Sequence, residues 1–371
     1  MKICAVIAEY NPFHNGHLKQ IEYIKETLPD TAVVAIMSGN VVQRGELTVL
    51  DKYTRAHSAV LCGVDAVLEL PYPWCGGSAG YFARGAMDIA KGIGADYLCF
   101  GSESGDIEEL KLCADRMKSK EYTELLDKLT REEQNIPYIA LSRSAYNELY
   151  NSEIPDGANN TLAIEYLKNI GDITPITYKR TFPSSATAAR EFYRNGLMKD
   201  LKNTVPSEAY GLYEWNIPVS NDCIEDIILW RLCNASKEEL CRYADVDLGM
   251  ASRLISSALE SESYDELMEK AAAKKYTNSR LRRCILNIIL STEKDHLEAK
   301  PVYTTLLAAN EKGCKAIKQI KKQGSITVIT KPADHSEVKE QFEFSAKADK
   351  LFLIAKGQKT ADIFKNKPVI L

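Results

Sequence analysis

Two histidines, His14 and His17, lie three residues apart where the sequence predicts the start of a helix. The apolar run of residues 3–7 precedes them, and Pro12 fixes the turn between that run and the helix. A helix start presents unpaired N–H groups and the positive end of the helix dipole, so it favours a bound anion. The spacing therefore indicates a phosphate site. Hydrogen bonding at the helix start and a metal site are the two other interpretations of the same pair.

A second helix start with similar chemistry follows later in the chain. A strand expected over residues 173–178 leads to Lys179 and Arg180, and then to residues 184–190, which read Ser-Ser-Ala-Thr-Ala-Ala-Arg. Hydroxyl groups and backbone amides are followed there by a cation, Arg190, about one turn into the helix. We interpret this segment as a second phosphate-binding arrangement in the same domain.

Alternating apolar and amphipathic segments must position these residues. We expect buried strands over residues 3–8, 32–37, 66–70 and 97–100, with helices over 16–28, 51–62 and 78–93 between them. This order predicts a parallel sheet with right-handed crossovers, in which ligands bind beyond the carboxyl ends of the strands. Polar loops follow these ends at residues 38–46, 71–78 and 101–106, and Arg44 in the first loop can offer a planar fork to a phosphate or carboxylate.

Composition limits the possible classes of protein. The chain has 371 residues, of which 45% are hydrophobic and 26% charged, and its formal net charge is -4. This is typical of a globular protein without an overall attraction to nucleic acid, and no apolar run reaches transmembrane length. The ten cysteines include no Cys-x-x-Cys pair, so we expect buried, reduced thiols, a cytoplasmic location and no protein metal site.

Two motifs in this order, His-x-Gly-His and Ser-x-Thr-x-x-Arg, resemble those of the nucleotidylyltransferase superfamily of Rossmann-like α/β enzymes. The chain is similar over nearly its whole length to one member family, the bacterial tRNA(Met) cytidine acetate ligases. The segments that carry this resemblance are 8–17 (Ala-Glu-Tyr-Asn-Pro-Phe-His-Asn-Gly-His), 37–46 (Met-Ser-Gly-Asn-Val-Val-Gln-Arg-Gly-Glu), 51–56 (Asp-Lys-Tyr-Thr-Arg-Ala), 63–71 (Gly-Val-Asp-Ala-Val-Leu-Glu-Leu-Pro), 100–103 (Phe-Gly-Ser-Glu) and 275–280 (Lys-Tyr-Thr-Asn-Ser-Arg).

The resemblance implies an enzyme that activates acetate with ATP to acetyl-adenylate and then acetylates N4 of the wobble cytidine of elongator tRNA(Met). It also implies a nucleotide site. For one member of that site it favours Asn160 over Asn159, a choice that spacing alone does not decide. The implied ATP-binding residues are Ile7, Ala8, Glu9, Tyr10, Asn11, Pro12, Phe13, His14, Asn15, Gly16, His17, Leu18, Lys19, Gln20, Gly101, Asn160, Arg180, Thr187 and Arg190.

The chemistry of such a reaction assigns roles to these residues. Attack on the α-phosphorus of ATP requires the β,γ-phosphates to be held and their growing charge stabilised. We expect His14 and His17 to do this, together with Mg²⁺, and Arg180 and Arg190 to neutralise other phosphate oxygens. Arg44 is the residue that we expect to orient acetate or phosphate.

Past residue 200 the pattern becomes helical. We therefore divide the chain into a nucleotidylyltransferase-like catalytic domain, residues 1–200, and a mainly helical domain, residues 201–371, that binds tRNA. Strands are expected near 327–329 and 351–354, in a small α/β end. The cations predicted to contact RNA phosphates are Lys275, Arg280, Arg282 and Arg283. The lysines of residues 312–322 share a helix face that is either a second RNA contact or simply solvated.

Two other functions remain open at this point. The first half alone would also suit a small-molecule adenylyltransferase of cofactor metabolism, although such an enzyme does not need a long, basic-patched second half. An RNA-binding module with a vestigial nucleotide fold is the non-enzymatic alternative.

Overall fold

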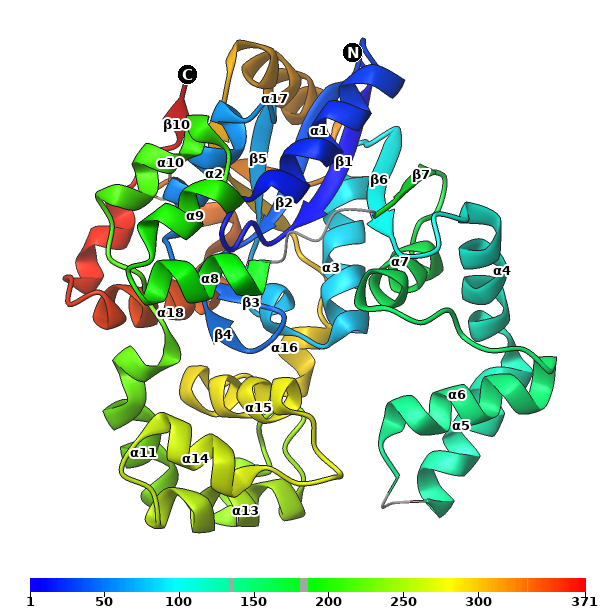
Figure 1. Cartoon of the computed structure of the whole chain (residues 1–371), viewed down its shortest axis with the longest axis vertical. Coiled ribbons are helices and arrows are strands. Elements are labelled where there is room, and N and C mark those ends of the chain that lie inside the picture. Colours follow the sequence, from blue (N-terminus) through cyan, green and yellow to red (C-terminus); the bar gives the residue numbers. More distant parts are fainter. Residues whose placement is uncertain (134–135, 181–185, 332) are drawn as a thin grey trace.

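The centre of this computed structural model, which describes residues 1–133, 136–180, 186–331 and 333–371, is a mixed β-sheet (Figure 1). Within these residues eight strands form it, in the order β10-β8-β5-β2-β1-β6-β7, with β9 paired to β8. Their bounds are β1 (Ile3–Ala8), β2 (Ala32–Ser38), β5 (Ala66–Leu70), β6 (Tyr97–Ser102), β7 (Thr174–Lys179), β8 (Tyr303–Ala309), β9 (Thr327–Ile329) and β10 (Val369–Ile370).

The strand order reverses beside β1. From β1 the chain proceeds to β2 and β5 on one side, and β6 and β7 then pair on the other, all in parallel. The loops that follow β1 and β6 therefore leave in opposite directions, and in open sheets of this kind ligands bind at the carboxyl ends of the strands beside such a reversal. This confirms the predicted parallel arrangement of the strands in the first half of the chain.

Alternate residues of the strands form two cores, one on each face of the sheet. Ile3 and Ala5 belong to the core under α3 (Ala79–Gly92) and α7 (Ala158–Lys168), whereas Cys4 and Val6 belong to the core on the opposite face. The helices on that opposite face are α1 (Asn15–Thr27), α2 (Lys52–Leu61), α8 (Ala186–Arg194), α9 (Met198–Thr204) and α10 (Ser207–Glu214).

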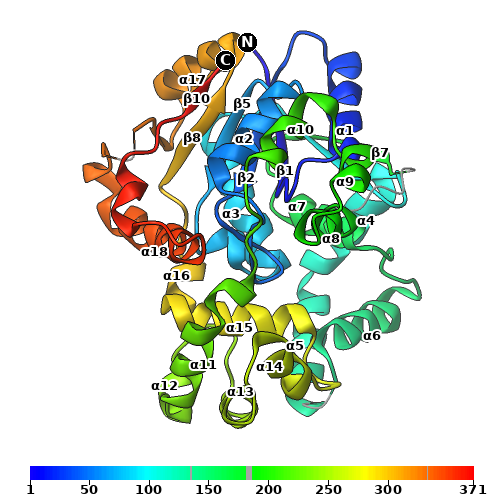
Figure 2. The ribbon, with the colours of Figure 1, turned by 60° about the vertical axis from the view of Figure 1, so that its left-hand side comes forward.

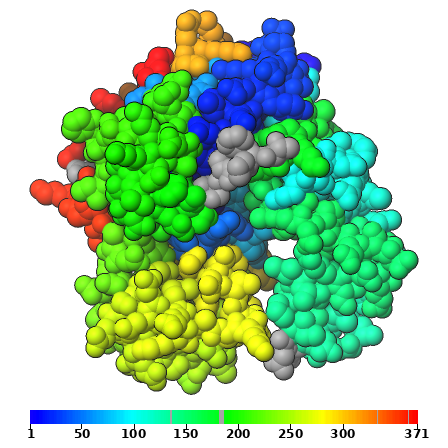
Figure 3. Space-filling model, viewed as in Figure 1, coloured from blue at the N-terminus to red at the C-terminus, as the bar shows by residue number. Residues whose placement is uncertain are grey.

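Two groups of helices extend below the sheet (Figure 2). The arm consists of α4 (Ile107–Lys118), α5 (Lys120–Glu132) and α6 (Tyr138–Tyr150). The helical bundle consists of η2 (Asn221–Ile224), α11 (Glu225–Cys233), α12 (Lys237–Leu240), α13 (Leu248–Leu259), α14 (Tyr264–Ala271) and α15 (Asn278–Leu290). A notch separates the arm from the α14–α15 part of the bundle (Figure 3).

The C-terminal segment returns to the sheet. Its helices are α16 (Lys294–Glu298), α17 (Glu311–Gln323) and α18 (Lys339–Ala355). Strand β8 pairs antiparallel with β5, so the sheet is mixed and part of the predicted second domain extends the sheet of the first. The strand predicted over residues 351–354 is wrong, because these residues lie in α18. A short apolar run does not distinguish a strand from a buried helical turn, and Leu351 and Phe352 are buried as part of the helix.

The structure also bears on the expected state of the cysteines and on the possibility of a membrane-spanning helix. All ten cysteines are free thiols; six are buried, as expected, whereas Cys314 is partly exposed and Cys223, Cys233 and Cys241 are exposed. None of the described helices is both long enough and apolar enough to cross a membrane.

Candidate active site

His14 and His17 shape the start of α1 with their own ring nitrogens. Nδ1 of His14, the N-cap residue, accepts the backbone N–H of Gly16 at 3.0 Å, and Nδ1 of His17 accepts the backbone N–H of His14 at 3.2 Å. The two rings stack with their centroids 3.7 Å apart. The hydrogen bonding at the helix start that the sequence left open is therefore present, and it fixes both rings at this position.

These hydrogen bonds also determine where the rings carry their protons. A ring nitrogen that accepts an N–H group carries no proton, so the neutral form of each ring has its proton on Nε2. Burial, reinforced by the charges of Arg180 and Arg190, lowers the pKa of His14 to about 4. Burial and the adjacent His14 lower the pKa of His17 well below its ordinary value. Near neutral pH, each ring is therefore a neutral N–H donor.

The lowered pKa of His14 predicts a pH dependence of stability. Between the ordinary value of 6.5 and about 4, the unfolded chain binds more protons at this residue than the folded chain does. We expect the free energy of unfolding to be highest above about pH 6.5 and to lose up to about 3 kcal/mol as the pH falls to about 4. Denaturant titrations over this range measure the effect. The slope should be smaller in His14→Gln, and an equal slope in the variant would contradict the assignment.

Gly101 and Arg180 come together where β6 and β7 end. A Cβ atom at Gly101 would lie 2.8 Å from Cγ of Arg180 and 2.9 Å from Cζ of Tyr178, so only glycine leaves room for the Arg180 side chain here. Nη1 of Arg180 donates to Oδ1 of Asn159 at 3.0 Å. Since Arg180 also acts on the pKa of His14, the ends of β6 and β7 and the histidine pair form one site.

Asn159 and Asn160 have different partners at the start of α7. Oδ1 of Asn160 accepts the N–H of Glu103 at 3.0 Å, and its Nδ2 donates to the Asp156 carbonyl at 2.6 Å. The Glu103 carboxylate in turn accepts the Asn160 N–H and Nδ2 of Asn159, both at 2.7 Å. The Asn160 side chain thus holds the loop that follows β6, and the Asn159 side chain is the one that contacts Arg180.

Arg190 joins α8 to the loop after β1. Its guanidinium donates to the Asn11 carbonyl at 2.9 Å and to Oγ1 of Thr187 at 3.1 Å, and the residue is 9% exposed. Burial lowers its pKa from the ordinary value. The second predicted helix start is therefore next to the first. Ser184 and Ser185, which begin that motif, lie outside the described residues.

Arg44 lies at the tip of a hairpin formed by β3 (Val41–Val42) and β4 (Glu46–Leu47). The backbone N–H of Gln43, also at the tip, donates to Oε1 of Glu9 at 2.8 Å. Burial raises the pKa of Glu9, and the charge of Arg44 partly opposes this effect. The hairpin tip thus reaches the loop that follows β1, and Arg44 is exposed there.

Arg55 connects three of the loops around the site, and the sequence did not predict this role. The residue is 1% exposed, and its guanidinium donates to the carbonyls of Glu9, Ser38 and Leu50 at 2.5, 3.1 and 3.0 Å. One sequence signal could have identified it. Arg55 lies on the apolar side of α2 with Ala56 and Ala59, and an arginine that only contacts solvent would be expected on the polar side.

A buried group of charges lies beside this network. Nζ of Lys52 contacts Oε1 of Glu69 at 2.7 Å and Oδ2 of Asp349 at 2.6 Å, and the lysine side chain is 7% exposed. Asp349 also accepts Nδ2 of Asn40 at 2.8 Å. Residues from α2, β5 and α18 thus meet in one cluster, which ties the C-terminal helix to the loop after β2. The sequence did not predict this contact, because Asp349 lies about three hundred residues from Lys52.

The cations predicted to bind RNA have different surroundings. Arg282 pairs with Glu46 of the hairpin at 2.6 Å, and Arg283 is 12% exposed with Asp245 at 3.9 Å. Arg280 pairs with Asp247 at 3.3 Å but remains 33% exposed, and Lys275 is partly exposed in the loop before α15. Arg282 is 29% exposed, so Lys275, Arg280 and Arg282 reach the surface, whereas Arg283 is mostly buried.

The lysines of α17 are placed at the opposite end of the molecule from α15 (Figures 1 and 2). Nζ of Lys312 donates to the Thr31 carbonyl at 2.7 Å, and Lys315 pairs with Glu311 at 2.7 Å. These contacts favour the interpretation of this face as a solvated helix surface that is partly used to attach α17.

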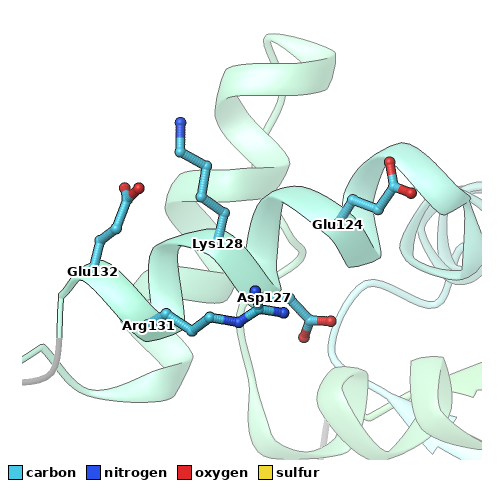
Figure 4. Close-up of a pocket in the computed structure, with 5 residues that line it drawn as sticks. All are labelled: Glu124, Asp127, Lys128, Arg131 and Glu132. Carbon is cyan, nitrogen blue, oxygen red and sulfur yellow. The ribbon is translucent and has the colours of Figure 1, made fainter.

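Two other features, a pocket on α5 and the described metal-ligating side chains, do not form a substrate or metal site. A shallow pocket on α5 is lined by Glu124, Asp127, Lys128, Arg131 and Glu132 (Figure 4), all from one helix of the arm and of mixed charge. It lacks the converging polar groups from several elements that a substrate site needs. Within the described part of the chain, no three His, Cys, Asp or Glu side chains gather in a way that could hold a metal ion.

Comparison with known proteins gives consistent matches over the length of the chain. Residues 1–366 match the family model described as HIGH Nucleotidyl Transferase. The tRNA(Met) cytidine acetate ligase of Clostridium acetobutylicum is 33% identical over 364 residues, which cover 89% of this chain and 90% of the relative. That of Acetivibrio thermocellus is 33% identical over 371 residues, with 90% and 89% covered. Thermotoga maritima TmcAL bound with alpha-thio ATP superimposes with a TM-score of 0.92 at 27% identity, with both chains covered fully.

Proposed function

The chain belongs to the HIGH nucleotidyl transferase family, and we propose that it is an ATP-dependent ligase that acetylates N4 of the wobble cytidine of elongator tRNA(Met). The observation that carries this proposal is the histidine pair, which hydrogen bonds fix at the start of α1 and which lies close enough to Arg180 and Arg190 for their charges to lower the pKa of His14. The relatives named as tRNA(Met) cytidine acetate ligases match both halves of the chain. This disfavours a small-molecule adenylyltransferase, which the first half alone would suit.

In the first step, a carboxylate oxygen of acetate forms a bond to the α-phosphorus of ATP. The bond from that phosphorus to the bridging oxygen breaks, and pyrophosphate leaves with the electron pair. The N–H groups at the start of α1 and Nε2–H of His14 and His17 would hold the departing phosphates. Arg180 and Arg190 would neutralise the other phosphate oxygens.

In the second step, the N4 amine of cytidine attacks the acetyl carbonyl of acetyl-adenylate. The acyl–oxygen bond breaks, AMP leaves and the nitrogen loses a proton. The base must be unstacked from the anticodon loop to reach the anhydride. The loop between α14 and α15, which contains Lys275, borders the notch below the sheet (Figure 3), and we propose that RNA phosphates bind there.

Mg²⁺ remains a prediction. The described residues offer no ready-made metal site, so Mg²⁺ would enter with the phosphates of ATP, where water and phosphate oxygens are its usual ligands. Bound there, it would offset the charge of the leaving group. The division of the chain at residue 200 and a cytoplasmic location are further proposals, and the ten free cysteines support a reducing compartment.

The direct test supplies purified protein with ATP, acetate and elongator tRNA(Met). Nucleoside mass spectrometry should detect N4-acetylcytidine, and omission of ATP or acetate should abolish it. Absence of an acetylated nucleoside with a competent tRNA would contradict the proposal. If ATP and acetate also gave no acetyl-adenylate, the RNA-binding module with a vestigial nucleotide site would gain support.

Gly101→Ala tests the nucleotide side of the site. The added Cβ would displace Arg180 from its place beside Tyr178, so we expect the dissociation constant for ATP to rise about tenfold, or about 1.4 kcal/mol. Isothermal titration calorimetry measures this. Gly211→Ala in α10 is the matched control, because a Cβ there meets nothing within 4 Å. Equal ATP affinity in the two variants would remove Gly101 from the site.

A further inference from the structure

The β3–β4 hairpin is held by the helical bundle. Arg282 on α15 pairs with Glu46 of β4 at 2.6 Å. Oδ1 of Asn221, in η2, accepts the N–H of Leu47 at 2.9 Å, and its Nδ2 donates to the Gly45 carbonyl at 3.2 Å. Asn221 is 4% exposed, and its Nδ2 also donates to the Tyr264 hydroxyl of α14 at 2.9 Å, so this buried amide joins the hairpin to the bundle.

Gly45 brings the two backbones into direct contact. Its φ is +77°, a left-handed conformation that favours glycine, and a Cβ there would collide with the backbone of Arg282 and Arg283. The start of α15 is thus packed against the turn of the hairpin with no space between them. A shift of α15 would therefore be passed on to the hairpin.

The other side of the same turn faces the adenylation site. The N–H of Gln43 donates to Glu9 in the loop that ends at His14. Arg44, which is exposed, is the next residue along this turn, so it is placed beside the loop that leads to His14. Six residues, 42–47, therefore span the distance between the bundle and the catalytic loop.

We propose that this hairpin transmits the position of the tRNA-binding bundle to the adenylation site, with Arg282 and Asn221 as positioning residues for Arg44. The inference rests on the proposed function. It changes the role predicted for Arg282, which would set the geometry of acetate activation even when no RNA is present. Lys275 and Arg280 remain the residues proposed to contact RNA.

The physical basis is the number of independent constraints on a short turn. An ion pair, two hydrogen bonds from a buried amide and a backbone contact all come from the bundle, whereas one hydrogen bond comes from Glu9. Catalytic groups must be held close to their productive position, and small displacements are costly to the rate. Loss of the Arg282–Glu46 pair should let the tip move and carry Arg44 with it.

The test is acetate-dependent ATP–pyrophosphate exchange without tRNA. Arg282→Ala should raise the KM for acetate on the order of tenfold, with the KM for ATP changed by less than about twofold. Glu46→Gln, which removes the ion pair with almost no change of volume, should also raise the KM for acetate; its KM for ATP is not part of the test, because the charge of Glu46 also acts on Arg190. Arg282→Lys should recover part of the loss, because it restores a cation opposite Glu46.

Arg231→Ala is the matched control. Arg231 pairs with Glu239 at 2.6 Å with similar exposure, but within the bundle and away from the hairpin. This variant should leave both KM values unchanged, and thermal melting should show whether Arg282→Ala and Arg231→Ala are equally folded. If neither Arg282→Ala nor Glu46→Gln raises the KM for acetate above that of the control, the inference is overturned. Absence of exchange in the unmodified protein would instead contradict the proposed function.

Discussion

Replacement of His17 by alanine is expected to lower the rate of acetate-dependent ATP–pyrophosphate exchange by about 10²- to 10³-fold, the usual cost of losing one preorganised donor to a developing negative charge. His17 would lose its Nε2–H donor, and the backbone N–H of His14 would lose its acceptor. The effect should be on kcat more than on the KM for ATP, because charge on the departing phosphates grows only as the bond breaks.

Two further variants show whether the lower exchange rate comes from the lost hydrogen-bond donor of His17. His57→Ala, in α2 and partly exposed, should leave the exchange rate unchanged. His17→Asn should recover part of the rate, since a side-chain amide both accepts and donates. Equal rates for His17→Ala and the unmodified protein, measured at saturating ATP and acetate, would remove the histidine pair from the reaction.

Replacement of Lys52 by methionine is expected to have the largest effect on stability. Glu69 and Asp349 would then share a buried site without the cation that both contact. Removal of one partner from a buried ion pair leaves uncompensated charge, which typically costs about 3–5 kcal/mol. Burial raises the pKa of Glu69 even with Lys52 present, so the variant should recover part of its stability at acidic pH, where Glu69 is neutral.

Urea denaturation at neutral and acidic pH measures both effects. Lys120→Met is the matched control, since the Lys120 side chain is 81% exposed and pairs with Glu124 at 3.6 Å on the surface of α5. That change should cost less than about 0.5 kcal/mol at any pH. Similar values for Lys52→Met and Lys120→Met would show that the buried cluster contributes little to folding.

The first half of the fold was predictable because its patterns are local. Strands β1, β2, β5 and β6 are short apolar runs separated by amphipathic helices, and such runs identify buried parallel strands. Strand β8 has the same buried character, but its partner β5 lies more than two hundred residues earlier. Nothing in residues 303–309 indicates this partner or its antiparallel direction.

The motifs predicted to bind ATP were equally local. The sequence singled out Gly101, Arg180 and the histidine pair, and in the structure Arg180 lies beside Gly101 and close enough to His14 to affect its pKa. It did not separate the partners of Asn159 and Asn160, because neighbouring amides at a helix start have the same chemistry until their partners are known. Charge density also predicted an RNA contact for Arg282, but it carried no sign of the ion pair that this side chain makes with Glu46 on β4.

By itself, the sequence determined the parallel sheet of the first half, the position of the histidine pair at the start of α1 and the family to which the chain belongs. These follow from residues close together in the chain, where spacing fixes geometry. Only the tertiary structure decided that α18 supplies Asp349 to a buried cluster and that α15 holds the hairpin of Arg44. Such contacts depend on which distant surfaces pack together, and the free energy of that packing is spread over many residues, so no short stretch of sequence specifies them.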